Sequence, residues 1–364
     1  MLELGVPPGI VAAEAALMVE GEAQPRLSAA LLALTVTETT EGLYRCEARF
    51  GNWGDRGQGP DYLYFDRTLL DFGKTLTVSL GAGLEEATVF TGRISALEGQ
   101  YPAGEPPQIV ALLEDAAQSL RQTRRTRTFE HLSDRAVFEK IAQDHGLQAD
   151  LDLEAPTCPV IAQLNQSDLA FLRDRVRRLG AEVWVDGTTL HVQGRRQRQQ
   201  RNDQLTLVLN RGLLEFSVIA DTANQATQVV VSGWDVQGKR RLEHTATDRT
   251  LGSELGQDTS AAGIVRQAFG ERTDRMVQHM PLTSAETQAI AEASFRAQAR
   301  RFVVGTGKAR GDARLRVGRA IALTGLGPLF DGTYYLSEVH HCFSRRPGGG
   351  YTTDFVVERP GLGS

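Results

Sequence analysis

The chain has 364 residues, of which 41% are hydrophobic and 23% are charged, and its formal net charge is −5. These values are typical of a globular protein with about two to four domains. They argue against a dedicated nucleic-acid binder, but they do not exclude a local basic patch on the surface. Cys46, Cys158 and Cys342 lie too far apart to predict a disulfide framework or a zinc site, which fits a reducing compartment.

The first residues do not have the pattern expected of an export signal. Residues 10–19 form an apolar run, but Glu14 interrupts it and no Lys or Arg precedes it. No stretch of the sequence approaches the roughly 20 apolar residues of a membrane span. We therefore expect the protein to be synthesised and to fold in the cytosol.

The first third of the chain predicts a β-rich unit. Polar and apolar side chains alternate with the two-residue period of strands in six segments: residues 16–19, 31–39, 43–50, 74–80, 87–94 and 108–113. These strands and their glycine-rich turns favour a sandwich or small barrel over residues 1–114. Residues 51–60 contain four glycines, which predicts an exposed, mobile loop.

The centre of the chain, residues 115–194, predicts a small module of two helices and a hairpin. Each helix is expected to begin at a serine N-cap that is followed by an aspartate, and to end at a glycine. The first helix would run from Ser133 to Gly146, and the second from Ser167 to Gly180. Apolar side chains recur at helical spacing in both segments.

Three further features complete this module. A short helix is expected at residues 115–122, and an irregular connector joins the two longer helices. Residues 182–192 then alternate as two strands of a hairpin, in which Asp186 and Gly187 predict a type I′ turn.

An arginine-rich segment follows the module. Residues 195–201 contain four arginines and no apolar or aromatic side chain. We interpret residues 195–204 as a linker, either a solvated loop or a patch that faces another protein. Phosphate binding is the weaker alternative, because single-strand binding also uses stacked aromatic side chains.

The remaining residues, 205–364, predict a second β-barrel with a helical insertion at about 258–304. Strands are expected at residues 205–209, 213–218, 226–234, 239–245, 320–324, 332–341 and 351–358. Within the insertion, a short helix at 260–269 precedes a longer helix, which begins at the capping box of Thr283.

No group of side chains predicts cofactor or metal binding. Lys308 follows a glycine as in a phosphate-binding loop, but no Ser or Thr follows the lysine. His340 and His341 are adjacent on a predicted strand, so they should point to opposite faces and not share a metal ion. His131 and His145 lack the spacing of metal ligands.

Paired carboxylates give no stronger signal. Asp168 and Asp174 lie about one and a half turns apart on one helix and face different directions. Glu215 and Asp235 could pair only across the second barrel, so glycosidase-like chemistry is a weak alternative. We predict no catalytic, cofactor-binding or metal-binding residue, and no enzymatic activity.

Two other features suit structural roles. Trp184 and Trp234 lie in predicted strands, where tryptophan normally packs in a core or an interface. The helix at residues 168–179 carries four arginines, a composition shared with DNA-recognition helices. However, a hairpin follows it directly and no partner helix is correctly spaced before it.

Short motifs along nearly the whole chain carry a family resemblance. They are residues 32–38 (LALTVTE), 72–74 (FGK), 90–94 (FTGRI), 126–129 (TRTF), 145–147 (HGL), 166–173 (QSDLAFLR), 180–190 (GAEVWVDGTTL), 229–235 (VVVSGWD), 330–334 (FDGTY), His341 and 351–353 (YTT). In this order and spacing they resemble the phage late control D family, the hub proteins of contractile tails and related injection systems.

The resemblance implies a fold, a stoichiometry and partners. The fold would be mainly β with α+β insertions, in which two tail-tube-like β-barrels flank the small module. Three chains would form a homotrimeric ring of six barrels, which adapts a hexameric tail tube to a trimeric spike. The implied partners are further copies of the chain, the tail tube protein, a VgrG-like spike protein, baseplate proteins and, as candidates, tape-measure protein or cargo.

The implied role is structural, without cofactor or catalysis, in a virion tail or injection particle assembled in the bacterial cytoplasm. Larger relatives continue into a spike domain, whereas this chain stops at Ser364, so we expect the spike to be a separate polypeptide. Residues 1–8 and 51–60 are not matched by the resemblance. Two alternatives stay open: a tail-associated cell-wall hydrolase and a nucleic-acid-binding regulator of late genes.

Overall fold

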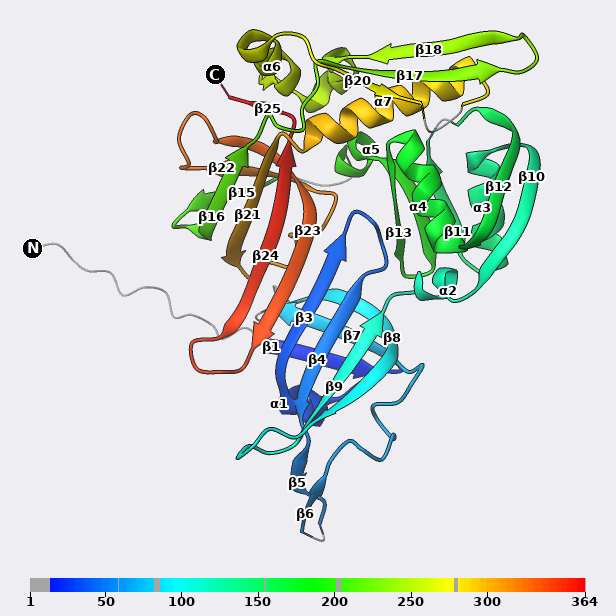
Figure 1. Cartoon of the computed structure of the whole chain (residues 1–364). Coiled ribbons are helices and arrows are strands. Elements are labelled where there is room, and N and C mark those ends of the chain that lie inside the picture. The colour runs from blue at the N-terminus through cyan, green and yellow to red at the C-terminus, as the bar shows by residue number, and fades with distance from the viewer. Residues whose placement is uncertain are drawn as a thin grey trace, which may run out of the picture.

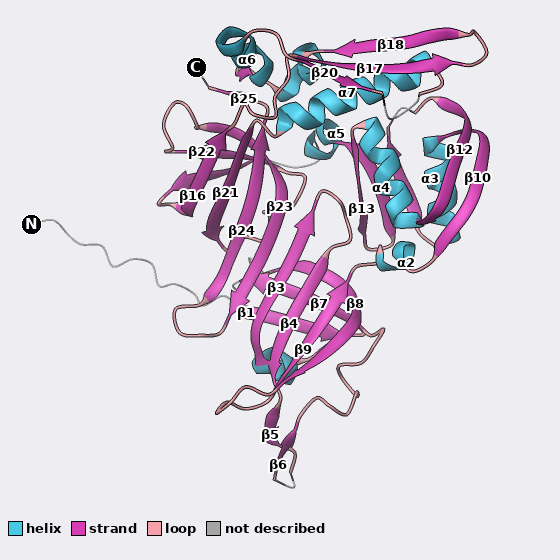
Figure 2. Ribbon diagram, viewed as in Figure 1, coloured by secondary structure: helices cyan, strands magenta, loops and turns pink. Residues whose placement is uncertain are grey.

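Thirteen strands form one large sheet in the computed structural model of the chain (Figure 1). The structure describes residues 14–57, 59–81, 86–153, 155–200, 204–277 and 281–363. Strands predominate over helices (Figure 2). The expected fold class, mainly β with two barrels beside a small α/β module, is confirmed.

The first β unit contains six strands in the spatial order β1-β7-β8-β9-β4-β3. They are β1 (Glu14–Val19), β3 (Leu31–Thr39), β4 (Arg45–Gly51), β7 (Thr75–Gly81), β8 (Ala87–Gln100) and β9 (Gln108–Glu114). In β7 every second side chain, Leu76, Val78 and Leu80, is buried in the core of this unit. Among the described residues β1 and β3 do not pair, so this barrel is open along one side.

The second β unit contains six strands in the order β15-β22-β23-β24-β21-β16. They are β15 (Leu205–Leu209), β16 (Gly212–Ala220), β21 (Val303–Arg310), β22 (Ala320–Thr324), β23 (Gly332–Ser344) and β24 (Gly350–Arg359). Because β15 also pairs with β16, this barrel is closed. Tyr334, Leu336 and Phe355 are buried in its core.

The two β units repeat one strand order, with strands that correspond one to one. Each contains a register shift at the same point of its long strand: between Ile94 and Ala96 in β8, and between Leu336 and Glu338 in β23. A second shift recurs where β3 pairs with β4 and where β16 pairs with β21. The units differ in polarity at one edge, since β1 is antiparallel to β7 whereas β15 is parallel to β22. A shared order with two shared bulges indicates an internal duplication.

The central module contains the predicted helices α3 (Asp134–Asp144) and α4 (Asp168–Leu179). Their serine N-caps are confirmed, because the Ser133 and Ser167 hydroxyls each accept a hydrogen bond from a backbone N–H three residues later. The glycine stops are confirmed too, with left-handed φ values of 68° at Gly146 and 66° at Gly180.

The predicted hairpin is present as β13 (Ala181–Asp186) and β14 (Thr189–Gly194), but its turn differs from the expected type I′. The two central residues are Gly187 and Thr188, and only Gly187 has a positive φ. This pattern fits a type II′ turn, which places glycine first.

The prediction of an irregular connector between the two longer helices was wrong. Its residues form β11 (Gln148–Asp152), which pairs with β14, and β12 (Thr157–Ser167), which pairs with β10 (Arg124–Ser133). The short helix α2 (Gln118–Arg121) precedes β10. Helices α3 and α4 cover these strands, and the shared apolar core includes Phe138, Leu172 and Val192.

The arginine-rich segment is not an extended linker. Residues Arg195–Gln200 form helix α5, which lies between the central module and the second β unit (Figure 1). Arg198 is buried and Arg195 is largely buried. Residues 201–203, including the fourth arginine of this segment, lie outside the described residues.

The insertion into the second β unit is larger than expected. The predicted strands at 226–234 and 239–245 exist as β17 (Gln228–Asp235) and β18 (Arg240–Ala246), but they do not belong to the barrel. They form a separate sheet with β20 (Thr273–Met276), against which α7 (Ser284–Arg300) packs. The helix α6 (Ala261–Phe269) and the Thr283 cap of α7 are confirmed.

The glycine-rich segment at 51–60 is not a simple loop. It contains β5 (Trp53–Asp55), which pairs with β6 (Pro60–Tyr62), and this hairpin projects from the far end of the first β unit (Figure 1). Trp53 and Tyr62 pack edge to face in it, with ring centroids 5.3 Å apart.

Candidate assembly interface

The two β units are joined through β3 and β23. These strands pair antiparallel from Thr39 opposite Glu338 to Ala33 opposite Ser344. The strands β16, β21, β24, β23, β3, β4, β9 and the far half of β8 therefore form one continuous, eight-stranded surface within the chain. A sheet shared between duplicated units fixes their relative orientation by backbone hydrogen bonds.

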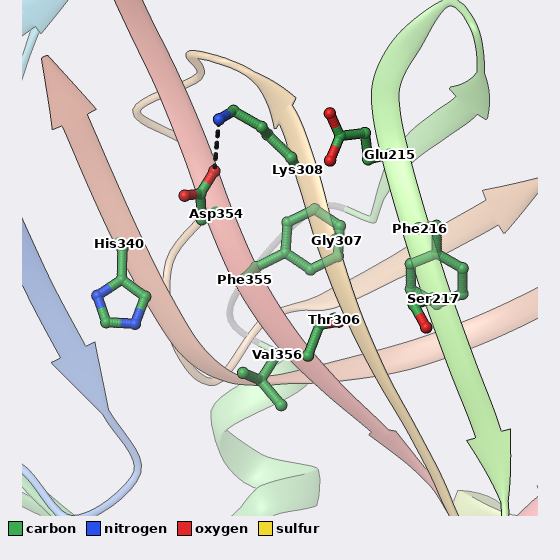
Figure 3. A pocket seen from close by; sticks show the side chains of 10 residues that line it. All are labelled: Glu215, Phe216, Ser217, Thr306, Gly307, Lys308, His340, Asp354, Phe355 and Val356. Carbon is green, nitrogen blue, oxygen red and sulfur yellow. Dashed lines mark ion pairs between the residues drawn. The ribbon is translucent and has the colours of Figure 1, made fainter. Parts of the chain in front are cut away.

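One face of this surface is polar and hollowed over the second β unit. The hollow has a volume of about 540 Å³ and is lined by residues of β16, β21, β23 and β24 (Figure 3). Lys308 Nζ lies 3.9 Å from Asp354 Oδ1, and both side chains are about 40% exposed. Lys308 is thus a strand residue in a surface ion pair, and it does not belong to a phosphate-binding loop.

A buried cluster of charges forms where the module, α5 and the second β unit meet. The Glu182 carboxylate lies 3.0 Å from Arg195 Nε and 2.9 Å from Arg198 Nη1. It also accepts a hydrogen bond of 2.5 Å from the Tyr335 hydroxyl. Burial alone would raise the pKa of Glu182, but the two arginines lower it below its usual range. The cluster is therefore charged and internally paired.

The same cluster reaches the first β unit. Arg198 donates a hydrogen bond of 2.8 Å to the Tyr44 hydroxyl, and its guanidinium stacks over Trp184 at 3.9 Å. Nearby, Arg316 pairs with the buried Glu38 of β3. These contacts tie the helix α5 to both β units and to the module, so the relative position of the three parts is set by buried electrostatic contacts.

A second charge cluster stabilises the module itself. Asp168, which is almost fully buried, lies 2.7 Å from Arg127 Nη2, 2.8 Å from His145 Nε2 and 2.8 Å from Gln163 Nε2. Although burial disfavours the charged carboxylate, the hydrogen bonds from His145 and Gln163 lower the pKa of Asp168. The cluster connects β10, α3, β12 and α4, and it has no exposed reactive group.

The remaining candidate residues are separated. His341 is buried beside Tyr351, while His340 points to the polar face and contacts Thr37 and Glu338. The two histidines therefore face opposite sides of β23, as predicted. His131 is exposed and takes no part in the Asp168 cluster that contains His145.

The carboxylates considered for glycosidase-like chemistry are also apart. Glu215 lies on β16 in the large sheet, whereas Asp235 lies on β17 in the three-stranded sheet and pairs with Arg240 at 3.1 Å. Asp174 pairs with Arg177 at 3.2 Å on the surface of α4. Trp234 is half exposed on β17.

Sequence reasoning missed the Glu182 cluster. Its one local signal is that Arg195 and Arg198 are three residues apart, which places them on one face of a helix. Their partners Glu182, Tyr335 and Tyr44 come from three other segments of the chain, so no local pattern indicates that the arginines are buried.

Within the described ranges, no three His, Cys, Asp or Glu side chains are grouped so that they could hold a metal ion. In the same part of the chain no helix is long and apolar enough to cross a membrane. The cysteines Cys46, Cys158 and Cys342 are unpaired by disulfides.

Solved structures share this fold at low sequence identity. A 43 kDa tail protein of prophage MuSo2 from Shewanella oneidensis is 12% identical, with a TM-score of 0.67 over 96% of this chain and 99% of that chain. A tail protein from Neisseria meningitidis is 14% identical, with a TM-score of 0.67 over 97% and 98% of the two chains. An E. coli component of the type VI secretion system is 12% identical, with a TM-score of 0.56 over 90% and 73%.

No curated protein matches the chain. One family model matches residues 54–344, which is most of the chain and includes the whole central module and part of each β unit. Its description names a domain and specifies no activity, substrate or partner. The chain belongs to the family described as the Alg8 N-terminal domain.

Proposed function

We propose that the protein is the structural hub of a contractile phage tail or contractile injection system, without catalytic activity. In this proposal three copies form a ring that adapts a hexameric tail tube to a trimeric spike. This is the role that the late control D resemblance implies. The function would be mechanical, because the ring would join the tail tube to the spike.

The observation that carries the proposal is the internal duplication. The orders β1-β7-β8-β9-β4-β3 and β15-β22-β23-β24-β21-β16 correspond strand by strand. A ring interface must repeat with the symmetry of the ring. A chain with two similar β units lets three subunits present six similar surfaces to a sixfold partner, while the rest of each chain keeps threefold symmetry.

The fold comparisons support the general part of the proposal, which is a role in a tail. One similar structure is described as a prophage tail protein, another as a tail protein, and a third as a type VI secretion component similar to T4 tail proteins. From these likenesses we infer tail tube, VgrG-like spike and baseplate proteins as partners, with tape-measure protein or cargo as further candidates. We place the protein in the virion tail or injection particle after assembly in the bacterial cytoplasm.

The proposal is tested by the mass of the assembled protein. Native mass spectrometry of the purified full chain, over a concentration series, should show a species of three copies that becomes dominant as concentration rises. A chain that stays monomeric at high concentration, even with its tube and spike partners present, would contradict the proposal. The hydrolase and the nucleic-acid-binding alternatives have no supporting arrangement among the described residues.

A further inference from the structure

The joint between β3 and β23 pairs one edge of each strand, and the corresponding edges of the duplicated strands have no partner strand among the described residues. In β23, residues 332–335 pair with β22 and residues 338–344 pair with β3 along the same edge. In β8, the strand that corresponds to β23, residues 87–93 pair with β7. The same edge of residues 96–100 has no backbone partner among the described residues.

In the part of the chain that the structure describes, the strand that corresponds to β3 is also unpaired on its outer edge. This strand is β16, which pairs with β21 on one side and with β15 only at Gly212 and Leu213. No described strand pairs with the other edge of residues 214–220. Long unpaired strand edges attract further strands, so native proteins normally cover them.

Side-chain exposure shows what is missing beside β16. Phe216 and Val218 of β16 are only half buried, whereas their counterparts in β3, Leu34 and Val36, are buried. Ile219, on the opposite face of β16, is 61% exposed. The pattern is that of a sheet strand whose neighbour is absent.

Side chains at the free edge of β8 are also less buried than their counterparts in β23. Leu97 is half buried, whereas its counterpart in β23, Val339, is fully buried. Just beyond the strand, Tyr101 is 65% exposed, whereas its counterpart Phe343 is 5% exposed. The two deficient edges lie at opposite ends of the eight-stranded surface, on β16 and β8 (Figure 1).

We propose that β16 of one copy pairs antiparallel with residues 96–100 of β8 in the next copy. The partner is a second copy of this chain, because the joint within the chain already shows these two corresponding edges bound to each other. The inference rests on the proposed ring and specifies its interface. Such a head-to-tail contact generates a closed ring when the rotation between copies closes.

The intramolecular register fixes the register between copies. Within the chain, Cys342 lies opposite Thr35 and His340 lies opposite Thr37. The shared bulges align β23 with β8, so that Cys342 corresponds to Gln100 and His340 to Glu98. They also align β3 with β16, so that Thr35 corresponds to Ser217 and Thr37 to Ile219. The expected pairs between copies are therefore Gln100 opposite Ser217 and Glu98 opposite Ile219. Gly99 then lies opposite Val218. In the native joint the Thr37 and His340 side chains touch, so Ile219 and Glu98 are expected to touch as well.

Disulfide trapping tests this register. In the full chain, Gln100→Cys combined with Ser217→Cys should give covalent oligomers up to three copies on a non-reducing gel after mild oxidation. The two positions lie at opposite ends of the surface within one chain, so a cross-link between them must join two copies. Gln100→Cys combined with Glu215→Cys is the control, since its diagonal spacing of roughly 7–8 Å exceeds disulfide reach. The wild type reports any cross-linking by Cys342.

Native mass spectrometry of the same samples separates the two proposals. Trimers that cross-link through positions 100 and 217, but not 100 and 215, support the inference. Trimers without a cross-link at 100 and 217 overturn the strand pairing and leave the hub proposal intact. Monomers throughout overturn both.

A charge exchange provides a second readout that needs no oxidation. Ile219→Glu places like charges opposite each other at Glu98 and should weaken trimer formation by about two- to fivefold for each interface. Ile219→Lys, its matched control, should assemble at least as well as the wild type. Adding Glu98→Lys to Ile219→Glu should restore assembly. All these side chains are exposed, so the fold of the monomer should be unchanged. Equal assembly of the Glu and Lys variants would overturn the pairing.

Discussion

Thr37 on β3 and His340 on β23 face each other across the joint between the two β units, with Oγ1 3.0 Å from Nδ1. They are 303 residues apart in sequence. Their contact lies on the polar face of a sheet that runs without interruption from one duplicated unit into the other. The chain thus contains, within itself, one example of the contact that a ring of duplicated units has to repeat.

The Glu182 cluster should dominate the stability of the junction. Glu182→Ala removes the carboxylate that Arg195 and Arg198 share. Arg195 keeps its contact of 2.6 Å with Glu358, so the cost arises mainly at the buried Arg198, and the free energy of unfolding should fall by about 3 kcal/mol. Glu41→Ala is the matched control, because Glu41 pairs with Arg177 between two half-exposed side chains. Its cost should stay below about 1 kcal/mol. Urea unfolding followed by circular dichroism measures both, and equal effects would contradict a structural role for the buried cluster.

The two helix-ending glycines should differ in their tolerance of alanine. Both have left-handed φ values, so alanine should cost about 1 kcal/mol at either position from backbone strain. A Cβ at Gly146 would meet no atom within 4 Å. A Cβ at Gly180 would lie 3.3 Å from the Cβ of Ala293 on α7, which adds a packing cost of about 1 kcal/mol or more. Thermal unfolding of Gly180→Ala and Gly146→Ala compares them, and an equal loss would show that α7 does not pack against this turn.

His341 should make stability depend on pH. Burial lowers the pKa of His341 to about 3, so the folded protein keeps this side chain neutral. The unfolded chain binds a proton as the pH falls through about 6.5, and the folded chain does not bind one until about pH 3. Stability should therefore fall as the pH is lowered from about 6.5 toward 3.

The variant His341→Asn isolates that contribution. Asparagine keeps a polar atom near the Tyr351 hydroxyl, which lies 2.7 Å from Nδ1 of His341, but it does not titrate. The variant should lose less stability than the wild type between pH 6.5 and pH 4, as measured by urea midpoints at each pH. Parallel curves for the two proteins would show that His341 is protonated equally in the folded and unfolded states.

Local signals in the sequence were sufficient for the helices and most barrel strands. Ser133, Ser167 and Thr283 define helix starts through contacts within three residues, so no tertiary information is needed. The alternation in β7 is similarly local. The duplication was expected from the family resemblance, whereas the matching bulges become visible only in the strand pairing.

The errors arose where distant residues decide the structure. The strands β17 and β18 have the same alternation as barrel strands, and only their pairing partners place them in another sheet. The strand β12 contains Pro159 and many polar side chains, so its pairing with β10 overrides a weak local preference. Arg195 and Arg198 resemble solvated charges until Glu182 is placed beside them.

The central claim, that duplicated β units close a threefold ring, is tested most directly by electron microscopy of the purified protein. End-on class averages of the assembled particle should show a closed ring around a channel, with three copies that contribute six similar lobes. An open dimer, a filament, or a ring in which the lobes of one chain do not alternate around the channel would contradict the account.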